Sequence, residues 1–243
     1  RPVCAQITCG AGKSRMIAEL IRRGNHIPCA ILVPARALLK QFRDELARWA
    51  PALSVGVVGD GLCELGRDVT ISTYNSVALL TDRRFRLLVV DEAHHMEDEF
   101  GDGQARRVFA RAARGLDYRR ALLVSATLSD TDSCAYRYGI ERAVDDGVVC
   151  DYHVVVPVFD GAGEKGPCLA VMLRDHPEWT RVLAYCNSVA AAAAFAAACC
   201  AAGLSAETFD GATPGPVRRA AIGRLTAGTI RVLVTVNTLG EGV

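Results

Sequence analysis

The chain has 243 residues, of which 51% are hydrophobic and 23% charged, so its composition excludes a disordered polypeptide and its length allows two packed cores. Its formal net charge of +1 creates no strong field around the protein, so a phosphate-bearing partner would have to be bound by local groups. The longest apolar run, residues 189–202, is mostly alanine and too short to cross a bilayer, so we expect no membrane segment.

The 10 cysteines show no Cys-x-x-Cys spacing, and only Cys199 and Cys200 are adjacent. Because no signal peptide precedes them, they are typical of reduced residues in an intracellular protein of the cytoplasm, nucleoid or nucleus, or of a virus-encoded one. The chain starts at Arg1 without a methionine and stops at Val243 just after a predicted strand. We therefore expect a fragment that is truncated at both ends.

A glycine-rich turn follows the first predicted strand, residues 3–8. The turn is Gly10-Ala11-Gly12-Lys13-Ser14, and an amphipathic helix comes directly after it. Two glycines allow the backbone N–H groups to point inward, the lysine adds a positive charge, and the serine hydroxyl is a suitable Mg²⁺ ligand. The strand, turn and helix therefore predict a phosphate-binding loop, although Ile7 stands where the usual pattern has its first glycine. The alternative is a glycine turn without a ligand.

A second motif is Asp91-Glu92-Ala93-His94-His95, which follows the apolar run at residues 87–90. The run is typical of a buried parallel strand, so both acids are expected at its carboxyl end, where open α/β sheets bind ligands. One carboxylate there can hold Mg²⁺ through water, and the next can orient and deprotonate an attacking water. A solvated acidic turn is the alternative. An acidic loop at residues 97–103 and a basic, mostly solvated helix follow.

Two further predicted strands in the first half end in polar residues. The strand at residues 29–33 ends at Pro34-Ala35-Arg36, and the strand at residues 121–124 ends at Ser125-Ala126-Thr127. With the glycine turn and the acidic motif, four strand ends carry polar groups and alternate with helices. This pattern predicts the ligand-binding edge of a doubly wound parallel sheet.

The apolar periodicity breaks up over residues 136–151, which we interpret as a linker between two α/β domains. A second set of α/β elements is expected to open at residues 152–159. The remaining elements are expected as helices at residues 167–175, 189–202 and 216–225 and strands at residues 181–185, 204–209 and 230–236.

In these motifs the chain resembles the superfamily 2 helicases and translocases over nearly its whole length. The loop resembles their motif I, residues 33–39 motif Ia, and Asp91-Glu92-Ala93-His94 the DEAH box. Further matches are residues 70–76 with a nucleic-acid motif, Ser125-Ala126-Thr127 with motif III, Cys186-Asn187-Ser188 with motif IV, and residues 233–242 with the start of motif V. His95 and residues 145–152 look closest to the DEAH group of type III restriction subunits and DNA-repair translocases, which favours DNA over RNA.

The resemblance implies an α/β fold of two RecA-like domains, residues 1–149 and an incomplete second domain at residues 150–243, with ATP between them. It implies that Lys13 holds the β- and γ-phosphates, that Ser14 and Asp91 hold Mg²⁺, and that Glu92 activates water. Gly242 would join the nucleotide site, and His94, Ser125 and Thr127 would couple it to nucleic acid. The residues implied to lie along the sugar-phosphate backbone are Pro34, Arg36, Thr73, Asn187 and Thr235.

The sequence lacks two parts of the family pattern: the adenine-reading motif that lies upstream of motif I and the motif VI arginines that approach the γ-phosphate. Loss of such an arginine costs on the order of a thousandfold in turnover. We therefore expect an ATP-dependent helicase or translocase whose fragment binds Mg-ATP weakly and hydrolyses it poorly.

The alternatives to a motor are a clamp, another class of phosphate-binding enzyme and a structural scaffold. A nucleotide-gated clamp that holds nucleic acid without turnover fits the same motifs. A kinase or GTPase does not explain the acidic strand end or the Ser-Ala-Thr strand end. A structural scaffold does not explain why Lys13, Asp91 and Glu92 should converge.

Overall fold

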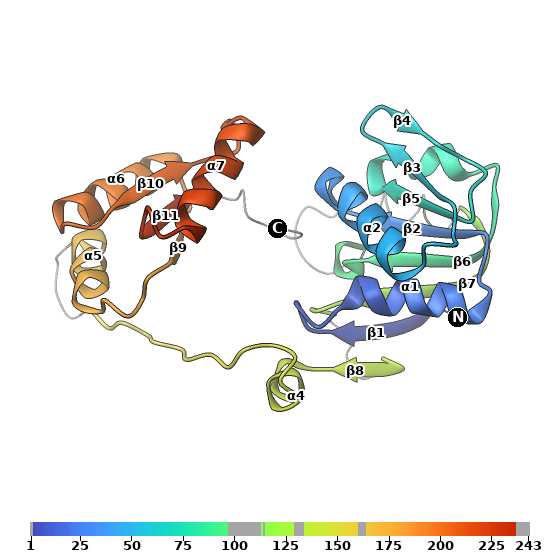
Figure 1. The fold of residues 1–243 in the computed structure, drawn as a ribbon, viewed down its shortest axis with the longest axis horizontal. Coiled ribbons are helices and arrows are strands. Elements are labelled where there is room, and N and C mark those ends of the chain that lie inside the picture. The colour runs from blue at the N-terminus through green and yellow to red at the C-terminus, as the bar shows by residue number, and fades with distance from the viewer. Residues whose placement is uncertain (1, 97–112, 114, 129–133, 160–163, 237–243) are drawn as a thin grey trace. The chain divides into compact units, whose positions relative to one another are not determined.

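The computed structural model describes residues 2–96, 113, 115–128, 134–159 and 164–236 (Figure 1). The chain divides into two compact units, Arg1–His153 and Val154–Val243. Each unit is built on its own sheet.

The first unit is built on one sheet of eight strands in the order β4-β3-β5-β2-β6-β7-β1-β8. All neighbouring strands in it are parallel except β3 and β4, which form an antiparallel pair. The strands are β1 (Val3–Ile7), β2 (Cys29–Val33), β3 (Val55–Gly59), β4 (Leu62–Cys63), β5 (Val69–Thr73), β6 (Arg84–Asp91), β7 (Asp117–Ser125) and β8 (Tyr136–Tyr138).

Both faces of this sheet are covered, which is why its central strands are continuous apolar runs. All five residues of β2 are buried, and they alternate between the two faces. Ile31 packs in the core beneath the helices α1 (Lys13–Gly24) and α2 (Arg36–Trp49). Leu32 packs on the other face with Val77 and Leu80 of the 3₁₀ helix η1 (Tyr74–Leu80). The expected parallel α/β fold is confirmed.

Strand register brings the polar strand ends to one edge of the sheet. Val33 of β2 lies opposite Thr73 of β5, and Asp91 of β6 lies opposite Val124 of β7. Ser125, the last residue of β7, lies opposite Gln6 of β1. The carboxyl ends of β5, β2, β6, β7 and β1 therefore form one row.

The second unit contains a parallel three-stranded sheet in the order β10-β11-β9. Val232 and Val234 of β11 pack on one face in a core with residues of α5 and α6, and Leu233 packs on the other face with Leu225 of α7. The elements are β9 (Val182–Tyr185), β10 (Ala206–Phe209), β11 (Val232–Thr235), α5 (Lys165–Asp175), α6 (Val189–Ala201) and α7 (Gly215–Thr226).

The linker predicted at residues 136–151 is wrong. This stretch contains β8, which pairs with β1, and the helix α4 (Ile140–Asp145), and both belong to the first unit. The sequence of β8, Tyr-Arg-Tyr, contains no apolar run that would predict a strand at the edge of the sheet. Conversely, residues 152–159 form no helix or strand, and Val154 and Val158 are 76% and 88% exposed. These residues have a high β propensity, but no strand of the described structure pairs with them.

Three other features complete the comparison with the sequence. The short strand β4 lies in the segment between β3 and β5 and was not predicted from the sequence. The acidic loop and most of the basic helix predicted after His95 lie outside the described residues. Within the described part of the chain, none of the helices is long and apolar enough to cross a membrane.

The Arg231 side chain anchors the end of α5 to the sheet of the second unit. Its Nε donates a hydrogen bond to the carbonyl oxygen of Trp179 at 3.0 Å, and its Nη2 donates to the carbonyl oxygens of Leu173 and His176. We expect Arg231→Met to lower the free energy of unfolding of the second unit by about 2 kcal/mol, because three partly buried carbonyls lose a charged donor. Urea titration followed by Trp179 fluorescence in a Trp49→Phe background measures this change.

The matched control is Arg219→Met, because Arg219 is an exposed residue of α7 in the same unit. Its change should stay within about 0.5 kcal/mol. Equal losses in the two variants would show that the carbonyl anchor contributes nothing specific.

Candidate functional site

The loop between β1 and α1 is shaped by two glycines in the left-handed region. Gly10 has φ +76° and Gly12 has φ +83°, a conformation that other residues adopt only at a cost. Gly12 is the residue before α1, and no side chain of the described structure caps the first turn of that helix. The N–H groups and the positive end of the helix dipole at Lys13 and Ser14 therefore suit an anion.

Lys13 forms an ion pair across this edge of the sheet with Glu92. The distance from Lys13 Nζ to Glu92 Oε1 is 2.6 Å, and the two side chains are only 14% and 13% exposed. Burial alone would lower the pKa of Lys13, but the hydrogen bond to Glu92 and the charges of Glu92 and Asp91 outweigh it, so the pKa lies above its ordinary value. The stabilisation from a raised lysine pKa is fully present at neutral pH and is lost only when the pH rises past that value. Lys13 therefore carries its positive charge near pH 7.

Glu92 is held in an uncommon backbone conformation. Its φ is +51°, in the left-handed region, which costs a non-glycine residue about 1–3 kcal/mol. The buried Tyr74 compensates, because its one hydroxyl proton is shared between the carbonyl oxygen of Asp91 and, at 3.2 Å, that of Glu92. Asp91 itself is buried at the end of β6. The strained turn thus directs the Glu92 carboxylate toward Lys13.

Ser125 connects the acidic motif with the end of β7. Its Oγ lies 2.7 Å from His94 Nδ1 and donates to Glu92 Oε2 at 3.4 Å, while the Thr127 N–H donates to it at 3.1 Å. A hydroxyl has one proton to donate, so donation to Glu92 requires that His94 Nδ1 carries the proton in the contact with Ser125. Lys13, Glu92, Ser125 and His94 therefore form one connected polar network.

The donor set fits a cation only in part. Among the described residues, no group of three or more His, Cys, Asp or Glu side chains is arranged to hold a metal ion. Asp91 and Ser14 supply a carboxylate and a hydroxyl, which is the small protein contribution typical of Mg²⁺ sites that are completed by phosphate oxygens and water. The residues therefore suit Mg²⁺ that arrives with a phosphate ligand.

The residues predicted to contact nucleic acid have different environments. In the first unit Pro34 is half-buried, and Arg36 is exposed and pairs with Asp60 at 3.3 Å. Thr73 is buried, and its hydroxyl donates to Ser76 at 3.0 Å.

In the second unit Asn187 is exposed and Thr235 is buried, on the adjacent ends of β9 and β11. The Cys186 N–H donates to the carbonyl oxygen of Thr235 at 2.9 Å, which fixes those two strand ends together. Gly242, expected in the nucleotide site, lies outside the described residues.

Tyr74 is a site residue whose role the sequence did not reveal. The sequence placed it in a motif expected to hold a sugar-phosphate backbone, yet its side chain is 4% exposed and supports the acidic turn. The available signal was an aromatic residue with a hydroxyl directly after a buried strand, because a buried tyrosine hydroxyl needs a hydrogen-bond partner.

Several solved structures share this fold at low sequence identity. The chain is similar to Saccharomyces cerevisiae Dbp5 bound to RNA and ADP BeF3, with a TM-score of 0.61 and 18% identity over 100% of this chain and 67% of that one. It is similar to the Sulfolobus solfataricus SWI2/SNF2 ATPase core in complex with dsDNA (0.51, 11%, 100% and 75%). It is also similar to a DEAD box protein from Methanococcus jannaschii (0.52, 17%, 100% and 71%).

The chain shares the fold of these three structures and spans about two thirds to three quarters of their length. Residues 1–130 match the family described as type III restriction enzyme, res subunit, and the chain belongs to that family. No curated protein matches it. The superfamily prediction is confirmed, while the DEAH-type and DNA-repair subgroup stays a prediction.

Removal of the Tyr74 hydroxyl tests its support of the acidic turn. We expect Tyr74→Phe to lower the free energy of unfolding by about 1–2 kcal/mol, because the ring stays packed while two carbonyls lose a donor. Urea denaturation measures the loss, and hydrogen exchange of residues 91–95 should become faster.

Tyr118→Phe is the control. Tyr118 packs against the same core as Tyr74, but its hydroxyl makes no hydrogen bond among the described residues. An equal loss in both variants, with unchanged exchange at residues 91–95, would contradict the role assigned to Tyr74.

Proposed function

We propose that this chain is the ATP-hydrolysing core of a nucleic-acid helicase or translocase. The observation that carries the proposal is the meeting of Lys13 and Glu92 at 2.6 Å, because it joins an anion-binding loop to an acidic motif 79 residues away. We also propose a functional boundary at residues 149 and 150, a few residues before the division between the compact units.

The proposed roles follow from the positions of the side chains. The backbone of Gly10-Ala11-Gly12 and the Lys13 ammonium bind the β- and γ-phosphates of ATP. Ser14 and Asp91 hold Mg²⁺, Asp91 through water. Bound Mg²⁺ supplies neutralisation of the charge that develops on the phosphate oxygens.

Glu92 is the proposed general base. In the present structure its carboxylate is engaged by Lys13 and by the Ser125 hydroxyl. A triphosphate carries more negative charge than one carboxylate and attracts the Lys13 ammonium away from Glu92. The freed carboxylate then accepts a proton from the attacking water. Release of the ion pair thereby makes the base available only when phosphate is bound.

His94, Ser125 and Thr127 are proposed to couple this site to nucleic acid. The Ser125 hydroxyl contacts Glu92 and His94 on one side, and the Thr127 backbone on the other. A shift of Glu92 therefore changes the hydrogen bonds at the end of β7.

We propose that nucleic acid binds at the carboxyl ends of the strands in each unit. The proposed contacts are Pro34, Arg36 and Thr73 in the first unit, and Asn187 and Thr235 in the second. Arg36 is the exposed charge in this set, whereas Thr73 and Thr235 are buried and would act through the strand ends. We favour DNA over RNA because the family is named for a restriction enzyme, although Dbp5 is bound to RNA.

Glu92→Gln separates a motor from a clamp that holds nucleic acid without turnover. We expect ATP turnover to fall on the order of 10²- to 10⁴-fold, since the amide cannot accept the proton, while ATP binding is retained. Release of labelled phosphate measures turnover, and equilibrium titration with a fluorescent ATP analogue measures binding.

Lys13→Ala is the control for the phosphate contact and should lose binding as well. A clamp would show turnover in the wild type as low as that of Glu92→Gln. Equal turnover of the two proteins would therefore overturn the assignment of Glu92 as the base.

Arg36→Ala tests the nucleic-acid edge. Loss of one phosphate contact should weaken binding of single-stranded DNA about equally for all sequences and reduce the salt dependence of log K by about 1. Fluorescence anisotropy at several salt concentrations measures both quantities.

Arg84→Ala is the matched control, because Arg84 is equally exposed, pairs with Asp117, and begins β6 at the opposite edge of the sheet. An equal effect of both substitutions would mean that DNA is attracted by general surface charge and not by the proposed edge.

A further inference from the structure

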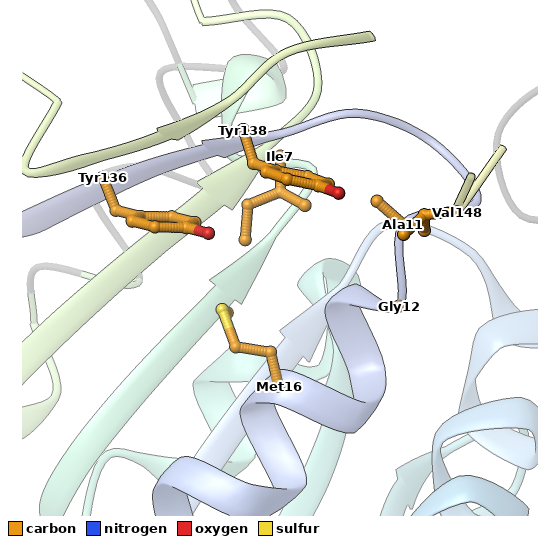
Figure 2. A pocket seen from close by; sticks show the side chains of 7 residues that line it. All are labelled: Ile7, Ala11, Gly12, Met16, Tyr136, Tyr138 and Val148. Atoms are coloured by element: carbon orange, nitrogen blue, oxygen red, sulfur yellow. The ribbon is translucent and has the colours of Figure 1, made fainter. Parts of the chain in front are cut away.

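A small hollow lies near the amino ends of β6 and β7, at the opposite edge of the sheet from the phosphate-binding loop. Its volume is about 180 Å³, and its walls come from the turn after α1 and from the first halves of the two strands. We call it the arginine hollow, and its described lining residues are Gly24, Asn25, His26, Arg86, Arg119 and Arg120. The cavity beside the phosphate-binding loop is different, because aliphatic and aromatic side chains line it (Figure 2).

Strand pairing crowds three arginines together in this hollow. Leu87 of β6 lies opposite Arg120 of β7, so the preceding residues, Arg86 and Arg119, are neighbours on adjacent strands. All three arginines are exposed. Like charges on paired strands destabilise the pairing when no counter-charge lies between them. The sheet therefore carries an unfavourable cluster of positive charge here, which a bound anion would relieve.

The protein itself supplies no counter-charge to this cluster. Within the described part of the chain, no acidic side chain lines the hollow, and the two arginines of β7 form neither an ion pair nor a side-chain hydrogen bond. Asp117, at the start of β7, pairs instead with Arg84 at 3.4 Å. The third arginine, Arg86, donates from Nη1 to the carbonyl oxygen of Asn25 at 3.4 Å, and this acceptor is neutral.

The turn after α1 holds an imidazole against the hollow. His26 is half-buried, and its ring nitrogens make no hydrogen bond among the described residues. A Cβ at Gly24 would lie 2.3 Å from His26 Nε2, so a side chain at this position would displace the ring. An imidazole has at least one N–H donor in every protonation state. The hollow therefore combines three guanidinium groups with a further donor.

The size and charge of the hollow suit a single phosphate group. It is smaller than the clefts of about 300–1,000 Å³ that hold larger organic ligands. The planar fork of each guanidinium group matches the oxygens of a phosphate. A phosphate monoester brings about −1.5 to −2 charges to one point, whereas a nucleic-acid backbone brings one charge per phosphate and extends along a track. Three converging arginines therefore favour the more highly charged and compact ligand.

We propose that the arginine hollow binds a phosphate dianion, either inorganic phosphate or the terminal group of a small phosphomonoester. The three arginines neutralise its charge, and His26 donates a hydrogen bond to one of its oxygens. β6 and β7 run from the hollow to Asp91 and Ser125 at the other edge of the sheet. The bound anion cancels the repulsion between the two strands and stabilises the first unit without entering the proposed ATP site.

The test is an NMR titration of the ¹⁵N-labelled 243-residue chain with inorganic phosphate and, separately, with glycerol 3-phosphate. We expect saturable shifts at the amides of residues 24–26, 86, 119 and 120. Arg119→Ala and Arg120→Ala should each weaken this binding about tenfold, because each removes a charge-assisted hydrogen bond. Lys13→Ala should leave it unchanged, since the phosphate-binding loop lies at the other edge. The amide spectrum of each variant also reports whether it is folded.

Arg83→Ala is the matched control. Arg83 is an exposed arginine directly before β6 and has no ion pair among the described residues, but it lines a different hollow. Its removal should leave the affinity within about twofold, because salt screens a solvated charge that makes no direct contact. A tenfold loss in this variant as well would mean that general surface charge attracts the anion, and would overturn the site.

The remaining outcomes separate the possible ligands. Shifts that sodium chloride reproduces at the same ionic strength, or shifts confined to residues 10–14, would contradict the proposal. A 5′-hydroxyl oligonucleotide carries only phosphodiesters and should not displace phosphate from the hollow. Displacement at an equal concentration of phosphate groups would overturn the preference for a dianion. Tighter binding of glycerol 3-phosphate supports the site and assigns it to phosphomonoesters, and tighter binding of inorganic phosphate supports it and assigns it to the free anion.

Discussion

The Lys13–Glu92 ion pair is the contact on which the rest of the site depends. The two residues lie on opposite sides of β7, since β1 and β6 are both neighbours of that strand and not of each other. They meet because the three strands are parallel and in register, with Asp91 opposite Val124 and Gln6 opposite Ser125. A slip of one residue in β6 would turn the alternating side chains to the other face and separate the charges. The buried apolar runs that determine the strand register therefore also determine which charged side chains meet at this edge of the sheet.

The same edge of the sheet contains a strained backbone turn, which the packed side chains around it hold in place. The positive φ of Glu92 persists because the ring of Tyr74 is packed in the core beside Val77 and Leu80 and its hydroxyl holds the turn. Ser125 is fully buried, so its contact with Glu92 is shielded from competing water. A carboxylate that is oriented by the backbone below it and a hydroxyl beside it needs little reorganisation before it acts. In this protein stability and function therefore draw on the same residues.

The parts of the fold that sequence predicted are those in which a long apolar run ends abruptly in polar residues. The apolar run at residues 87–90 predicted β6 and the position of Asp91, and the glycines predicted the turn before α1. The parts of the fold that the sequence did not predict depend on neighbouring strands. β8 is a strand only because it pairs with β1, whereas the valine-rich residues 152–159 form no strand. The direction of the Tyr74 hydroxyl and the pairing of Lys13 with Glu92 are likewise contacts between distant segments, which no local pattern encodes. Composition and spacing could indicate candidate residues for the proposed site but not the hydrogen bonds between them.

The ion pair has a consequence for control of the proposed reaction. Lys13 and Glu92 are nearly buried, so their attraction is screened less than that of a surface pair. While Glu92 Oε1 accepts the hydrogen bond from Lys13, that oxygen is occupied and does not accept a proton from water. Phosphate supplies another partner for the ammonium and frees this oxygen at the moment when a base is required. The same lysine would therefore suppress water activation without nucleotide and permit it with nucleotide, and the switch requires no moving part larger than one side chain.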